Sequence, residues 1–89
     1  MIMKFEIYRI EVYWVGNQKK AGVREKSTGH SVLNMSYPSY TVLIRLCNWA
    51  AQHLQDNKKV TPKQLWAKAD VHLKQLEKDF ATELAAGLV

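Results

Sequence analysis

The chain has 89 residues, of which 47% are hydrophobic and 24% charged, a composition typical of one small folded domain. Its single cysteine excludes an intrachain disulfide and a cysteine-rich structural zinc site, and is usual in a reducing compartment, so we expect a cytoplasmic protein. Charge at Lys4 and Glu6 interrupts the apolar start of the chain, so we expect no signal peptide. The formal net charge of +5 permits nucleic acid or another acidic partner without requiring one.

Residues 1–36 predict a three-stranded antiparallel β-meander. The first strand is expected over residues 4–15, because apolar and polar side chains alternate from Tyr8 to Trp14. Phe5 and Ile7 have the opposite parity, which indicates either a bulge near Tyr8 or a cover on the other face of the strand.

A turn is expected over residues 16–20, where glycine, asparagine and lysines follow the first strand. The second strand is expected over residues 21–27. Its Gly22 and its charged side chains indicate an exposed edge strand. A turn over residues 27–29 and a short third strand over residues 30–35 complete the meander.

The most apolar stretch predicts a buried central helix over residues 39–56. Pro38 favours its first turn, and Ser36 or Ser39 can cap it. Its polar residues recur every three or four positions, so they form one narrow stripe along the helix, which we expect to be its only wet edge. The apolar run is too short and too interrupted to span a bilayer, so no membrane association is expected.

A long amphipathic helix is expected over residues 61–87. Thr61 and Gln64 form a capping box around Pro62, and Gly87 ends the helix. The segment from Phe80 to Val89 is apolar enough to need a cover, either by folding back along the first helix or by forming a homodimer. The expected fold is α+β, with the meander packed on two C-terminal helices in the order β-β-β-α-α.

No pattern in the sequence indicates catalysis. His30, His53 and His72 lie in no metal-ligand spacing with one another or with Cys47, and the glycines form no phosphate-binding loop. No nucleophile, base and orienting group fall into a recognisable arrangement. We therefore expect no enzyme, no cofactor and no metal, although a metal-free ribonuclease built from Arg, Lys, His and Tyr side chains stays open.

Two groups of basic residues are the strongest functional signal. The first lies on the first hairpin with two aromatic residues among the cations, a combination that suits phosphate contacts and base stacking. The second surrounds the start of the second helix, whose N-terminal dipole favours anions. Ordinary surface lysines would give similar patterns. The candidate residues are Arg9, Tyr13, Trp14, Lys19, Lys20, Arg24 and Lys26 in the first group, and Lys58, Lys59, Lys63 and Lys68 in the second.

Three functions fit these features. The first is a non-enzymatic module that binds nucleic acid, or a nucleic-acid-handling complex, through the basic hairpin. The second is a protein-binding inhibitor or adaptor, for example a phage-type antagonist of a host defence complex. The third is a structural protein that dimerises through its long helix. Over residues 8–55, the order of three strands and a helix resembles the arm-type DNA-binding modules of phage recombinases. This is a likeness of fold alone, with no sequence motif behind it, and a fold does not determine a function.

Overall fold

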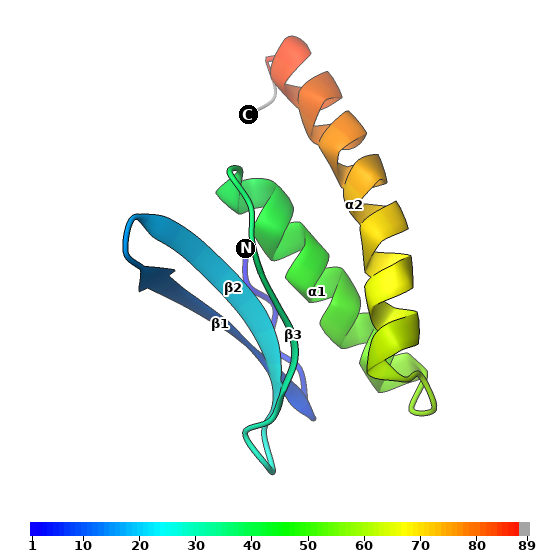
Figure 1. Cartoon of the computed structure of the whole chain (residues 1–89). Helices are drawn as coiled ribbons and strands as arrows, with labels where there is room; N and C mark the ends of the chain where they lie inside the picture. Colours follow the sequence, from blue (N-terminus) through cyan, green and yellow to red (C-terminus); the bar gives the residue numbers. More distant parts are fainter. Residues whose placement is uncertain (88–89) are drawn as a thin grey trace.

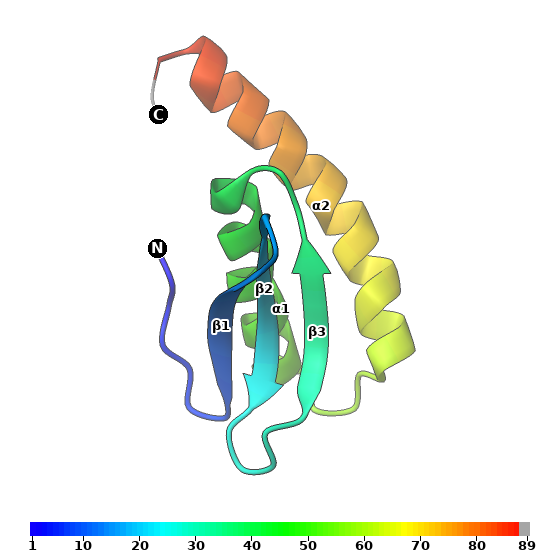
Figure 2. The same cartoon turned by 60° about the vertical axis from the view of Figure 1, so that its left-hand side comes forward.

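The computed structural model describes residues 1–87 and confirms the α+β fold, with three antiparallel strands followed by two helices (Figure 1). The helix α1 covers one face of the sheet, and α2 packs against α1 beside the third strand (Figures 1 and 2). The five elements are β1 (Tyr8–Val15), β2 (Gln18–Glu25), β3 (Ser31–Ser36), α1 (Tyr40–Asp56) and α2 (Pro62–Ala85).

The sheet has the order β1-β2-β3, so the prediction that the second strand is an exposed edge was wrong. Its charged residue Arg24 is tolerated in a central strand because it lies on the face of the sheet that no helix covers. The first turn is also shorter than predicted, since only Gly16 and Asn17 separate β1 from β2. Gly16 has φ +60°, the conformation that glycine adopts in tight two-residue hairpins. As a result, β2 begins at Gln18 rather than at residue 21.

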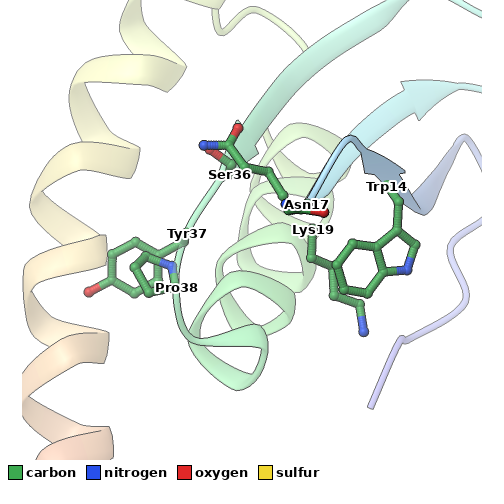
Figure 3. A pocket seen from close by; sticks show the side chains of 7 residues that line it. Trp14, Asn17, Lys19, Ser36, Tyr37 and Pro38 are labelled. Carbon is green, nitrogen blue, oxygen red and sulfur yellow. The ribbon is translucent and has the colours of Figure 1, made fainter.

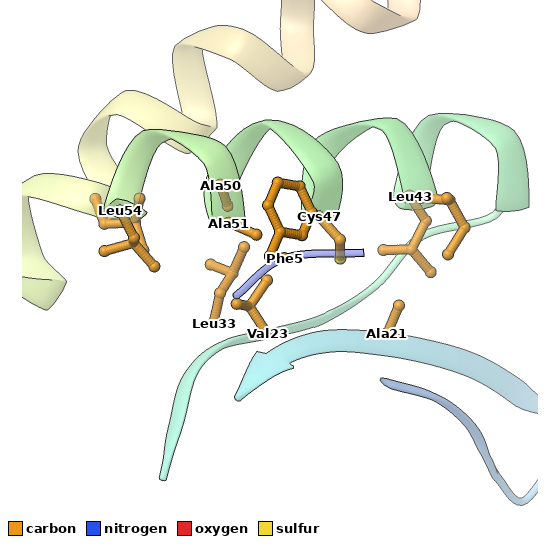
Figure 4. Packing of buried hydrophobic residues seen from close by; sticks show 11 residues of the cluster. Phe5, Ala21, Val23, Leu33, Leu43, Cys47, Ala50, Ala51 and Leu54 are labelled. Carbon is orange, nitrogen blue, oxygen red and sulfur yellow. The ribbon is translucent and has the colours of Figure 1, made fainter. Parts of the chain in front are cut away.

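The core lies between the inner face of the sheet and α1 (Figure 4). Because side chains alternate along a strand, Ala21 and Val23 of β2 point at α1, and Leu33 of β3 does the same. Small residues of α1, such as Ala50 and Ala51, allow the helix to approach the sheet closely. The buried apolar residues of α1 are Val42, Leu43, Ile44, Leu46, Cys47, Ala50, Ala51 and Leu54.

The segment before β1 is not part of the sheet, so the strand expected from residue 4 begins only at Tyr8. This segment instead runs against α1, where Phe5 is buried in the core (Figure 4). The Asn48 side chain accepts a hydrogen bond from the Met3 N–H at 3.0 Å and donates one to the Met1 carbonyl at 2.7 Å. The Gln55 side chain accepts from the backbone N–H of Glu6 at 3.1 Å. The opposite parity of Phe5 therefore reflects a separate segment and not a bulge.

Part of the polar stripe of α1 is covered, and not wet as we expected. Asn48 and Gln55 of this stripe bind the N-terminal segment. Arg45, a third member, forms a bidentate ion pair with Glu83 of α2. The guanidinium of Arg45 also lies 5.8 Å from the centroid of the Phe80 ring. The polar side chains of α1 thus hold its neighbours in place, because an amide or guanidinium in this position can satisfy exposed backbone and carboxylate groups.

The helix α2 folds back along α1, and Glu83 near its end is paired with Arg45. Folding back was one of the two arrangements that we considered for the segment beginning at Phe80. The Thr61 and Gln64 capping box is present at its start, and Gly87 follows its end with φ +71°. Leu65 and Ala69 are its only fully buried side chains among those described, and Trp66 stays 44% exposed. The segment from Phe80 to Val89, for which we expected a cover, includes residues 88 and 89, which lie outside the described residues. Neither helix in the described part is long and apolar enough to cross a membrane.

Replacing Gly22 with alanine should destabilise the fold. A Cβ atom at this position would lie 2.5 Å from the Leu33 carbonyl oxygen, so the backbones of β2 and β3 would have to move apart. Overpacking of this kind costs about 1–3 kcal/mol. Urea unfolding followed by circular dichroism should show a lower midpoint for Gly22→Ala. Ser36→Ala, on an exposed strand position, should stay within about 0.5 kcal/mol of wild type. Equal midpoints for the two variants would contradict the close approach of these strands.

Candidate functional site

The outer face of the sheet carries four of the predicted site residues. Arg9 and Arg24 are partners in the β1–β2 register, and Tyr13 is the partner of Lys20. Gly22 lies between Lys20 and Arg24, so β2 contributes no side chain at this position of the face. The element contacts place both helices away from it. Figure 2 shows the sheet with α1 behind it. The outer face is therefore a mainly basic surface that is open to a partner.

A carboxylate that the sequence analysis did not single out organises this face. Arg9 lies 2.8 Å from one oxygen of Glu11, and the Nε atom of Arg24 donates to the other oxygen. The Nη1 atom of Arg24 also donates a hydrogen bond to the Gly29 carbonyl at 2.7 Å, so the guanidinium of Arg24 is fixed in place. Arg9 is the more exposed of the two arginines, at 54%. Arg24 thus orders the face, whereas Arg9 is exposed and Lys20, which is half-buried, has no ion pair among the described residues.

The sequence contained a signal for Glu11, because it lies two positions after Arg9 and so shares its face. What the sequence could not show is that Glu11 is opposite Gly22, a register that follows from the two-residue turn. With no side chain at that position, Arg24 can reach across to the same carboxylate. An open hollow of about 390 Å³ beside Tyr13 is lined by Glu11, Val12 and Arg24.

Trp14 and Lys19 lie at the hairpin end of the sheet, which we call the tip, and not on the outer face. They are register partners on the inner face, beyond the first turn of α1. The Lys19 ammonium lies 3.8 Å from the centroid of the Tyr40 ring and 5.4 Å from that of Trp14. Trp14 is 64% exposed. The tip therefore combines a solvent-facing indole with a cation held by two aromatic rings.

A hollow of about 380 Å³ opens at the tip. Trp14 and Lys19 are on one side of it, and Tyr37 and Pro38, from the connection between β3 and α1, are on the other (Figure 3). The lining is completed by Asn17 of the hairpin turn, Gln18 at the start of β2 and Ser36 at the end of β3. The sequence did not predict this hollow. Pro38 was interpreted only as a residue that favours the first turn of the helix, and the position of Tyr37 and Pro38 beside the hairpin depends on the whole fold.

The remaining predicted site residues lie elsewhere. Lys26 is seven residues from Lys19 along the chain, roughly 23 Å at the rise of a strand, and its ammonium donates to the Phe5 carbonyl at 2.5 Å. The β2–β3 turn and the α1–α2 connection are at the same end of the molecule, opposite the tip (Figures 1 and 2). The exposed lysines near that end are Lys58, Lys59 and Lys63. Lys68 lies on α2 beside Trp49 and Val71. The predicted residues thus form separate groups on the outer face, at the tip and at the opposite end.

Two histidines stack on one tryptophan between the helices. The Trp49 ring lies 4.6 Å from His72 of α2, with the planes 17° apart, and 5.2 Å from His53 of α1, with the planes 13° apart. Among residues 1–87, no three His, Cys, Asp or Glu side chains converge as they would around a metal ion. The histidines therefore serve the packing of α2 against α1.

Comparison of the chain with protein-family models, with curated proteins and with solved structures finds no match in any of the three. The likeness to arm-type DNA-binding modules therefore remains one of element order alone. Function has to be inferred from the surfaces of this molecule.

Cys47 should be chemically inert in the folded protein. Its side chain is 0% exposed, and burial raises the pKa of the thiol to about 12. We expect no reaction with a thiol-specific disulfide reagent at about pH 8, where an exposed thiol reacts readily. In denaturant, one equivalent should react at once. Rapid modification without denaturant, with the circular dichroism spectrum unchanged, would contradict the burial of this thiol.

The stability of the fold should depend on His72 as the pH falls. Desolvation lowers the pKa of His72 below its ordinary value of 6.5, and this effect outweighs the opposing field of Asp79. The folded state therefore prefers the neutral ring, so stability is complete above pH 6.5 and is lost as the pH falls through the lower folded-state pKa. Urea unfolding over this range should show a flatter pH profile for His72→Gln than for wild type. His30→Gln, in the exposed β2–β3 connection, should keep the wild-type slope.

Proposed function

We propose that this protein is a small, non-catalytic binding module that engages nucleic acid through the outer face of its sheet. The observation that carries the proposal is that α1 covers one face of the sheet, whereas the other face stays open and holds Arg9, Lys20 and Arg24 around Gly22. Guanidinium and ammonium groups on an open surface suit the phosphates of a nucleic acid backbone. The free Cys47 fits a reducing compartment, so the proposed location is cytoplasmic.

The charge on the outer face limits how many phosphates it can bind. Two arginines share the single carboxylate of Glu11, which leaves one positive charge in excess from the three groups. Lys20 adds a second. Each neutralised phosphate changes the logarithm of affinity by about −0.9 per logarithmic unit of salt on duplex DNA. The proposal therefore corresponds to a weak contact of the outer face with about two phosphates.

The lysines at the opposite end can extend the contact. Lys58, Lys59 and Lys63 surround the start of α2, where the helix dipole also favours anions. These lysines lie at the end opposite the tip, so a short ligand bound to the outer face near the tip would not need to contact them. Charge reversal in each group measures their contributions independently.

The alternative function is a protein-binding inhibitor or adaptor, including a phage-type antagonist of a host defence complex. The exposed apolar residues at the tip favour it, since Trp14 is 64% exposed, Val15 52% and Tyr40 42%. Exposed aromatic residues of this kind often anchor protein interfaces. The third function, a homodimer through α2, has less to support it. The exposed residues Trp66 and Leu84 are 18 positions apart on α2, roughly 27 Å at the rise of a helix, and the exposed Val71 faces another direction.

Charge reversal on the outer face tests the proposed function. In fluorescence anisotropy with labelled single- and double-stranded oligonucleotides, wild type should bind with a salt slope equivalent to about two phosphate contacts. Arg9→Glu with Lys20→Glu should abolish this binding at moderate salt, because two attractive contacts become repulsive. Lys74→Glu with Lys78→Glu makes the same charge change on the exposed side of α2 and should leave affinity within about twofold, since distant surface charges are screened.

Glu11→Gln should raise the affinity for nucleic acid, whereas the charge reversal lowers it. The substitution removes the one carboxylate between the two arginines while keeping its shape, so affinity should rise several-fold at low salt and the salt slope should steepen by about one phosphate contact. Loss of affinity in Glu11→Gln, or unchanged affinity in the Arg9 and Lys20 double variant, would move the binding surface away from the outer face. Lack of binding by wild type at low salt would refute the proposed function.

A further inference from the structure

We infer that the hollow at the tip holds one unpaired base of a single-stranded nucleic acid, so that the module prefers single strands to duplex. This inference rests on the proposed function and identifies the class of nucleic acid. It is carried by the juxtaposition of the exposed Trp14 indole, the amides of Asn17 and Gln18, and the Lys19 ammonium around one hollow.

Trp14 offers an aromatic ring that is mostly exposed, with the Lys19 ammonium 5.4 Å from its centroid. It has the inner-face parity of β1, but it lies beyond the start of α1 at Tyr40 and remains 64% exposed. A large exposed indole at the rim of a hollow is suited to stacking with another planar ring. Every nucleobase presents such a face once it is unpaired, which is how proteins bind single strands without reading their sequence.

The polar groups of the hollow match the edge of a base. Asn17 and Gln18 each provide both a donor and an acceptor, and the Ser36 hydroxyl provides both as well. None of the described side chains that line the hollow is acidic, so a phosphate can approach it. Its volume of about 380 Å³ lies within the range of sites that hold small planar molecules.

The hollow borders the basic outer face at Ser36. Ser36 lines the hollow and is also the register partner of Lys20, whose side chain is on the outer face. Lys19 and Lys20 are consecutive in β2 and so point to opposite faces at the tip. A strand whose base enters the hollow would therefore have one lysine near the phosphate on either side. In a duplex the bases are stacked and paired, so none is free to enter.

The test compares Trp14→Ala with Trp66→Ala, which removes another exposed tryptophan, on α2. Anisotropy is measured with a labelled oligodeoxythymidine, a duplex of the same length, and an abasic oligonucleotide that keeps the phosphates. We expect Trp14→Ala to weaken binding of the single strand about tenfold, in line with the loss of one stacked base. Duplex affinity should change less than twofold. Trp66→Ala should bind all three oligonucleotides like wild type, and Trp14→Phe should recover most of the loss.

The abasic oligonucleotide isolates the stacking contact. Wild type should bind it about tenfold more weakly than oligodeoxythymidine, and this difference should be much smaller for Trp14→Ala, because the ring that stacks on the base is then absent. Equal losses for single strand and duplex in Trp14→Ala would overturn the inference. So would single-strand binding that is unchanged in Trp14→Ala but abolished by Arg9→Glu with Lys20→Glu, a result that leaves the proposed function standing. Failure of wild type to bind any oligonucleotide overturns both and points to a protein as the occupant.

Discussion

The burial of α1 is the constraint on which the rest of this structure depends. Three parts of the chain share its surface, namely the sheet, the N-terminal segment and α2. Fully burying one aliphatic side chain contributes about 1.5–3 kcal/mol, and α1 has eight buried residues, all of them apolar. No single covering part could bury them all, because each reaches a different side of the helix. The inner sheet face is therefore committed to the core, whereas the outer face and the tip stay open to a partner.

Local patterns in the sequence were sufficient for the elements and their order. The alternation around Val12 indicated a strand, the apolar run around Leu46 a buried helix, and the capping box at Thr61 the start of α2. Each of these signals arises within a few residues. The parts that were missed depend on residues far apart. Phe5 was read as part of the strand because nothing nearby shows that Asn48 and Gln55 would bind the backbone of its segment.

The predicted basic residues of the hairpin do not form one surface, and this too depends on pairing between residues far apart in the sequence. Adjacent lysines such as Lys19 and Lys20 point to opposite faces, and the turn of only two residues fixed which face each one takes. Glu11 looked like an ordinary exposed acid, yet it is the partner of two arginines. The number of cations in a sequence therefore overstates the charge that a ligand meets, because register decides which of them are already neutralised.

The attachment of the N-terminal segment to α1 also bears on how the chain folds. Most contacts join neighbours in sequence, as in the two hairpins and the α1–α2 pair, and such local contacts favour rapid folding. The hydrogen bonds to Asn48 and Gln55 instead join residues 45 and 49 positions apart. During synthesis, Phe5 leaves the ribosome well before the helix that will bury it. The sheet can form its hairpins first, whereas the docking of Phe5 must wait until α1 has been made, so closure of the core is a late step.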